Sequence, residues 1–228
     1  IWKERWLKTA MLNDVEAHYT CKKGRIDSFE LFQTGTKDYP TLRAHKTRIA
    51  ILKKYRGVYR VHRTVPVEYS GERTKVPKMI GKVCPDILYP NYKDHDYVSV
   101  ILDKKSLQNI ESNLVNVSDP FLKSILWSDL WQMVLKQKMD MSRYLEIAEY
   151  NGLTESNLDI VSSVFGNVAS ILNKYYPNTG QPWTAQREVW VKFFEQAYMT
   201  KINELVEDPV AQKIWFKNLL QISESSDV

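Results

Sequence analysis

The side chains that most often carry metal or acid–base chemistry are sparse in this sequence. Its four histidines are His18, His45, His62 and His95, and none belongs to an H-E-x-x-H motif. A G-x-S-x-G elbow, a Walker loop and a dinucleotide-binding fingerprint are also absent from the sequence. We therefore predict no catalytic, cofactor-binding or metal-ligating residue in this chain.

The densest polar cluster is Asp94-His95-Asp96. A metal site or an acid–base pair is conceivable at this point. We favour a solvated turn before a strand at residues 97–102, because three consecutive side chains of an extended segment cannot converge on one point.

A basic stretch from Arg43 to Arg63 holds eight cationic residues and no acid: Arg43, Lys46, Arg48, Lys53, Lys54, Arg56, Arg60 and Arg63. Tyr55 and Tyr59 lie among them, as on surfaces that bind single-stranded nucleic acid. However, the isoelectric point of 9.0 is only moderately basic, and no nucleic-acid-binding motif occurs. We therefore favour a face that docks on another, acidic domain over a nucleic-acid partner.

Two further residue pairs invite a functional interpretation. Trp127 and Trp131 are four positions apart on a predicted helix, a spacing that favours packing between helices over stacking on a ligand. Cys21 and Cys84 belong to no C-x-x-C pair. One disulfide between them is conceivable, but we favour two free thiols, which fit a reducing compartment and a cytoplasmic location.

The length of the chain and its charge distribution indicate two structural parts with different surroundings. The 228 residues are 43% hydrophobic, which excludes a disordered chain, and no apolar run is long enough to span a membrane. The net charge of +5 is unevenly distributed, with +8 in residues 1–103 and −3 in residues 104–228. Because the first residue is Ile1 rather than Met, we expect a segment of a longer protein.

The first half has the pattern of β-strands. Over Val58–Tyr69, apolar and polar residues alternate with a period of two, and shorter strands are predicted at residues 25–34, 47–53 and 97–102. Because Pro66 lies inside the predicted strand Val58–Tyr69, that strand should be at a sheet edge or carry a bulge. Short strands without helical crossovers predict an antiparallel β-sandwich of about seven strands at residues 14–103.

The second half has the period of helices. Apolar stripes and turn residues predict six helices, near residues 104–115, 119–136, 142–151, 156–175, 184–206 and 208–222. Asp119 and Asp208 each precede a proline, so these two residues are expected to cap helices, and a further apolar stripe follows Asn157. The predicted class is therefore α+β and multidomain, with a β-sandwich followed by an α-helical bundle or superhelix at residues 104–228.

Several segments resemble the bacterial branch of the aminopeptidase N family of zinc metallopeptidases. Trp6–Ala10 with Asn13 is similar to the W-L-x-T-x-G-x-N segment that closes that family's catalytic domain, although Met11-Leu12 stands where a glycine is usual. Pro40–Lys46 is similar to its L-R-P-H-R element, with Ala44 in place of proline. The resemblance continues, in order and spacing, through Pro85–Leu88, Pro90-Asn91, Asp94, Asp96-Tyr97, Val100, Leu102-Asp103, Asp119-Pro120, Trp127 and Trp131–Met133.

This resemblance covers about residues 5–176 and implies a chain without its own active site. Residues 1–13 would be the tail of a catalytic domain, and the residues that bind zinc and substrate would lie in that absent domain. The expected partners are the catalytic domain of the same polypeptide and a peptide substrate that passes the helical domain, with no membrane. The expected role is to cap the active-site cleft and limit access. A free-standing scaffold or peptide-binding module, with a sandwich and helical repeats, is the alternative.

Overall fold

The structure is a computed structural model that describes residues 2–176 and 184–223. The chain divides into two compact units, residues 1–133 and 134–228, which are described separately below. The domain boundary at residues 103 and 104 stays a prediction.

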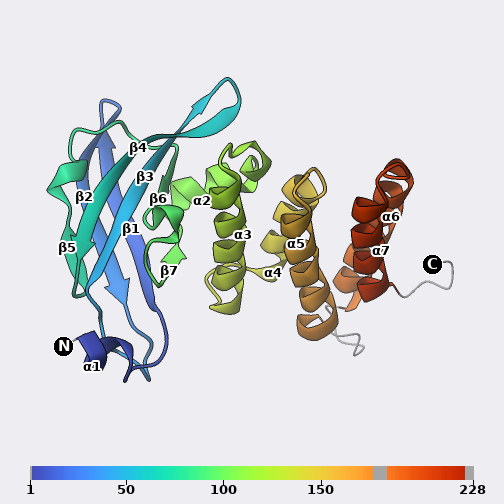
Figure 1. Cartoon of the computed structure of the whole chain (residues 1–228), viewed down its shortest axis with the longest axis horizontal. Helices are drawn as coiled ribbons and strands as arrows, with labels where there is room; N and C mark the ends of the chain where they lie inside the picture. Colours follow the sequence, from blue (N-terminus) through green and yellow to red (C-terminus); the bar gives the residue numbers. More distant parts are fainter. Residues whose placement is uncertain (1, 177–183, 224–228) are drawn as a thin grey trace. The chain divides into compact units, whose positions relative to one another are not determined.

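In the first unit, the described residues form seven strands in two sheets (Figure 1). The sheet of order β5-β2-β1-β7 consists of β1 (Asn13–Lys22), β2 (Arg25–Thr34), β5 (Arg73–Lys75) and β7 (Val98–Ile101). The sheet of order β4-β3-β6 consists of β3 (His45–Tyr55), β4 (Val58–Tyr69) and β6 (Ile87–Tyr89). The expected α+β class is confirmed. One pair departs from an antiparallel arrangement: β1 and β7 are parallel, which the long connection between them allows and a hairpin does not.

The strand β4 spans the residues that the alternation predicted. Tyr59, Val65 and Val67 on its inward face are buried, whereas Glu68 is exposed. As the proline predicted, β4 is an edge strand, paired with β3 alone among the described strands. Pro66 lies opposite Arg48 in this pair, and its missing N–H does not interrupt the ladder because it faces the free edge.

Helices and short turns complete the first unit. They are α1 (Trp2–Trp6), the 3₁₀ turns η1 (Pro77–Met79), η2 (Tyr92–Asp94) and η3 (Leu114–Asn116), α2 (Lys104–Glu111) and α3 (Pro120–Leu135). Asp119 caps α3 as predicted, because its Oδ1 accepts from the N–H groups of Phe121 and Leu122. Trp127 on α3 is buried, in agreement with the packing interpretation.

The two cysteines form a disulfide, so the expectation of two free thiols is wrong. Sequence spacing could not show that the end of β1 lies beside the segment that precedes β6. Backbone hydrogen bonds bring this segment there: the N–H of Cys84 donates to the carbonyl oxygen of Gly24 at 2.9 Å. The argument for a reducing, cytoplasmic location rested on free thiols and loses its support.

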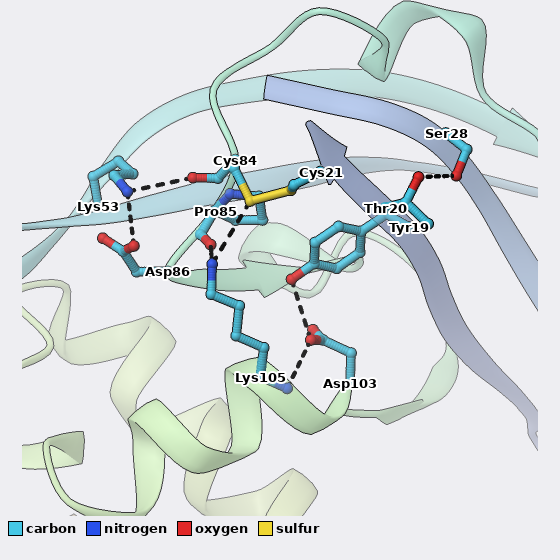
Figure 2. The surroundings of a disulfide bond; sticks show 10 residues. All are labelled: Tyr19, Thr20, Cys21, Ser28, Lys53, Cys84, Pro85, Asp86, Asp103 and Lys105. Carbon is cyan, nitrogen blue, oxygen red and sulfur yellow. Dashed lines mark hydrogen bonds and ion pairs between the residues drawn. A yellow bond between two sulfur atoms is a disulfide. The ribbon is translucent and has the colours of Figure 1, made fainter. Parts of the chain in front are cut away.

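Two lysines hold the backbone around the disulfide (Figure 2). Lys53 Nζ donates to the carbonyl oxygen of Cys84 at 3.3 Å and pairs with the Asp86 carboxylate at 2.7 Å. Lys105 Nζ donates to the carbonyl oxygen of Pro85 and lies 3.7 Å from Cys84 Sγ. Burial acts to raise the pKa of Asp86, but hydrogen bonds from the Lys53 side chain and the Lys54 N–H outweigh it and lower that pKa. Lys53 on β3 and Lys105 on α2 therefore both hold residues 84–86 in place through hydrogen bonds.

The second unit is helical. It contains α4 (Met141–Ile147) with a π-helical continuation (Ala148–Gly152), α5 (Leu158–Ser170) with another (Ile171–Tyr175), α6 (Thr184–Glu204) and α7 (Pro209–Ile222). The cap predicted at Asp208 is confirmed by a hydrogen bond to the first turn of α7, and Asn157 caps the first turn of α5 in the same way. Phe165 has no exposed surface and packs against Phe194, Tyr198 and Trp215. None of the described helices is long and apolar enough to cross a membrane.

Removing the disulfide should destabilise the first unit. Cys21 and Cys84 are 63 residues apart, and the loop-closure model assigns a crosslink of this length about 4 kcal/mol. We expect Cys21→Ser/Cys84→Ser to lower the free energy of unfolding of this unit by up to that amount, measured by urea denaturation. A reducing agent should destabilise the unsubstituted chain equally and leave the double variant unchanged. If the unsubstituted chain and the double variant were equally stable, each with and without the reducing agent, the disulfide would not stabilise this unit.

Candidate functional site

The four histidines do not gather at one point. His18 on β1 is exposed and lies 3.2 Å from the Glu16 carboxylate, while His62 and His95 are also exposed. Only His45 is buried. Within residues 2–176 and 184–223, no three His, Cys, Asp or Glu side chains are grouped so that they could hold a metal ion.

His45 forms a buried pair with Asp96, one member of the polar cluster noted in the sequence. The Nδ1 atom lies 2.9 Å from Asp96 Oδ2, which also accepts from the N–H of Lys46 at 3.0 Å. Because this oxygen serves as an acceptor, Nδ1 is assigned the proton. The expected solvated turn is therefore correct for the exposed Asp94 and His95 but wrong for Asp96, whose side chain is only 11% exposed.

His45 and Asp96 are oriented like an acid–base dyad, but a substrate has no access to the imidazole. The imidazole is enclosed by Tyr69, whose ring stacks on it at 4.9 Å, and by Trp6, whose ring meets it edge-on at 5.5 Å. The side chain of His45 is 0% exposed. Because a substrate cannot reach a fully enclosed ring, the pair serves to position the start of β3.

Arg43, two residues before His45, makes several hydrogen bonds in the same region. Its guanidinium donates to the carbonyl oxygen of Arg5 at 2.8 Å, to Thr9 Oγ1 at 2.8 Å and to the carbonyl oxygen of Ala10 at 3.2 Å. It also donates to Asn13 Oδ1 at 3.2 Å. All partners given by the described residues are neutral oxygens, so the buried cation is solvated by the N-terminal segment rather than paired with an acid.

The contacts of Arg43 join two segments that carry the family resemblance. Trp6, Thr9 and Asn13 come from the first, and Arg43 comes from the second. The guanidinium carbon lies 5.2 Å from the centre of the Trp6 ring, a cation–π geometry. Sequence reasoning identified both segments but had no signal that they touch. We call Trp6, Thr9, Asn13, Arg43, His45 and Asp96 the Arg43–His45 cluster.

The other members of the basic stretch are divided among different roles. Lys53 holds the segment beside the disulfide, and Lys54 Nζ donates to Asn113 Oδ1 at 2.9 Å. Arg56 stacks on Tyr55 at the turn between β3 and β4. Arg60 and Arg63 are exposed on β4. The eight cations thus do not form one continuous face.

A hollow of about 620 Å³ lies between the start of β3, the end of β4 and the segment around η1. We call it the basic groove, because four cations line it: Lys46, Arg48, Lys75 and Lys78. Glu68 and His95 are its other titratable residues, and Pro66, Val67, Val76 and Pro77 are the apolar residues of the lining. The hydrogen bond and the charge of Lys46 lower the pKa of Glu68, and the charge of Lys78 acts in the same direction. Sequence reasoning missed Lys75 and Lys78, which lie outside the basic stretch.

Comparison with known proteins relates the chain to aminopeptidases. It is 28% identical over 193 residues to Aminopeptidase N of Streptomyces lividans. The match covers 79% of this chain and 22% of that protein, so the chain spans about a fifth of the length of this relative. The sequence profile of the ERAP1-like C-terminal domain matches residues 87–219, more than half of the chain. The chain therefore belongs to the ERAP1-like C-terminal domain family.

Proposed function

We propose that this chain is the non-catalytic C-terminal part of a zinc-dependent aminopeptidase that removes N-terminal residues from peptides. The observation that carries the proposal is the profile match over residues 87–219, supported by the 28% identity to Aminopeptidase N of Streptomyces lividans. The zinc and the catalytic residues would belong to a preceding domain of the same polypeptide. The grouping of acids, histidines and cysteines among the described residues does not fit a zinc site.

In this proposal the two units have different roles. The two sheets, packed as a sandwich, would join the catalytic domain to the helices and hold them at a fixed distance. The helices, as part of a superhelix, would cover the active-site cleft and limit access to short or unfolded peptides. The disulfide favours an oxidising compartment over the cytoplasm for such a protein.

The Arg43–His45 cluster supports a junction at residues 1–13. If these residues end the preceding domain, Arg43 fixes that end to the start of β3 through the carbonyl oxygens of Arg5 and Ala10. A buried guanidinium that loses these acceptors keeps an uncompensated charge, which costs several kcal/mol. The catalytic domain would therefore be attached through a rigid connection rather than a flexible linker.

The purified chain should have no peptidase activity of its own. We expect no measurable hydrolysis of aminoacyl-arylamides with added zinc, with the intact Streptomyces lividans relative as positive control. We also expect well below one tightly bound zinc per chain by atomic absorption after dialysis. Turnover that copurifies with the chain and is abolished by a chelator would refute the proposal.

The access role can be tested in the intact parent with Phe165→Ala. Emptying this enclosed aromatic site should cost about 3–5 kcal/mol and loosen the second unit. We expect kcat/KM for a small aminoacyl-arylamide to change less than that for a large or folded substrate, whose cleavage should rise. A parallel change in both values, compared in the same preparation, would argue against a role in access.

The junction can be tested with Arg43→Lys, which keeps the charge but removes the forked donor geometry. Loss of the hydrogen bonds to the N-terminal segment should lower its opening free energy by about 2 kcal/mol, or about 30-fold in hydrogen exchange of the Leu7 amide, which donates to the carbonyl oxygen of Lys3. The control is Arg60→Lys, an exposed position on β4. Unchanged exchange in the Arg43 variant would show that Arg43 does not hold this segment.

A further inference from the structure

The basic groove brings together cations that are far apart in the sequence. Lys46 and Arg48 come from the start of β3, whereas Lys75 and Lys78 come from the segment around η1. We propose that the basic groove binds an extended acidic peptide segment supplied by another polypeptide chain. The proposal stands on the groove alone and does not depend on the parent enzyme.

Most of the positive charge in the groove is unbalanced. Lys46 pairs with Glu68 at 2.8 Å, but both side chains are largely exposed, at 81% and 71%. Arg48, Lys75 and Lys78 make no ion pair with any residue that the structure describes. Bringing acidic groups among three unpaired cations is therefore favourable, whereas a basic segment would be repelled.

The spacing of the cations suits an extended ligand. Lys46 and Arg48 are two residues apart on β3 and face the same side of the sheet, about 7 Å apart along the strand. Alternate side chains of an extended peptide have the same spacing. Acids at every second position of such a segment can thus meet both residues, while Lys75 and Lys78 contact it from the other wall.

The rest of the lining favours a peptide as well. Between the cations, the exposed residues Pro66 and Pro77 provide apolar surface for the uncharged side chains of such a segment, whereas Val67 and Val76 are buried in the lining. Addition of the peptide as a further strand on β4 is disfavoured at Pro66, because this residue has no N–H for the free edge. Recognition would therefore depend on side-chain charge and apolar contact rather than on backbone pairing.

A nucleic acid fits the groove less well. Strands of nucleic acid are held by stacking on aromatic side chains as well as by charge. The described residues that line the groove include no Phe, Tyr or Trp, and Tyr55 lies at the far end of β3.

The proposal can be tested by fluorescence anisotropy with a labelled peptide of four Glu-Val repeats. We expect saturable binding to the 228-residue chain with a dissociation constant below about 1 mM. A peptide of four Gln-Val repeats should bind at least tenfold more weakly. Absence of saturable Glu-Val binding, or equal affinity for the two peptides, would overturn the proposal.

Two charge-matched variants locate the site. Arg48→Gln/Lys78→Gln should weaken Glu-Val binding roughly tenfold, the loss expected for two exposed charge contacts. Arg60→Gln/Arg63→Gln removes the same charge from exposed positions outside the groove lining and should change the affinity less than twofold. Equal weakening by both variants would show non-specific attraction and overturn the assignment. Tighter binding of a ten-nucleotide oligothymidine that is lost only in the groove variant would assign the groove to nucleic acid instead.

Discussion

The buried guanidinium of Arg43 is the interaction on which the N-terminal half depends. It lies where the start of β3, the β1 residue Asn13 and the N-terminal segment meet, and neutral oxygens of that segment satisfy it. Because a charge of this kind is costly to leave unsatisfied, the fold of the sheets and the placement of residues 5–10 are mutually dependent. This gives a physical reason why two separate segments of the family resemblance occur together.

A second constraint fixes the other end of β1. The Cys21–Cys84 disulfide, Lys53 and Lys105 all hold residues 84–86, directly before β6. The strand β6, which follows directly, pairs with β3. It also contacts α2, because the N–H of Leu88 donates to Ser106 Oγ at 2.8 Å. The start of α2, which follows the last strand β7, is thus anchored to residues 85–88 by Lys105 and Ser106. A rigid connector of this kind suits the proposed role between a catalytic domain and a helical cover.

Local patterns predicted the elements well because the physics that forms them is local. The alternation over Val58–Tyr69 marks one face of β4, and the caps at Asp119 and Asp208 need only backbone N–H groups a few residues away. Contacts between distant segments escaped prediction. Nothing in the spacing of Cys21 and Cys84, or of His45 and Asp96, shows that each pair meets in space. The same limit hid the basic groove, which combines cations from β3 with two from near η1.

The central claim is that this domain belongs to a larger enzyme that supplies the chemistry. Aminopeptidase N of Streptomyces lividans is several times longer than this chain, which corresponds to 22% of it. The most direct measurement is the coding sequence upstream of Ile1. The account predicts one continuous reading frame with an H-E-x-x-H motif a few hundred residues before this position, followed by a further glutamate that completes the zinc site. A reading frame that begins near Ile1, with no peptidase domain before it, would contradict the account.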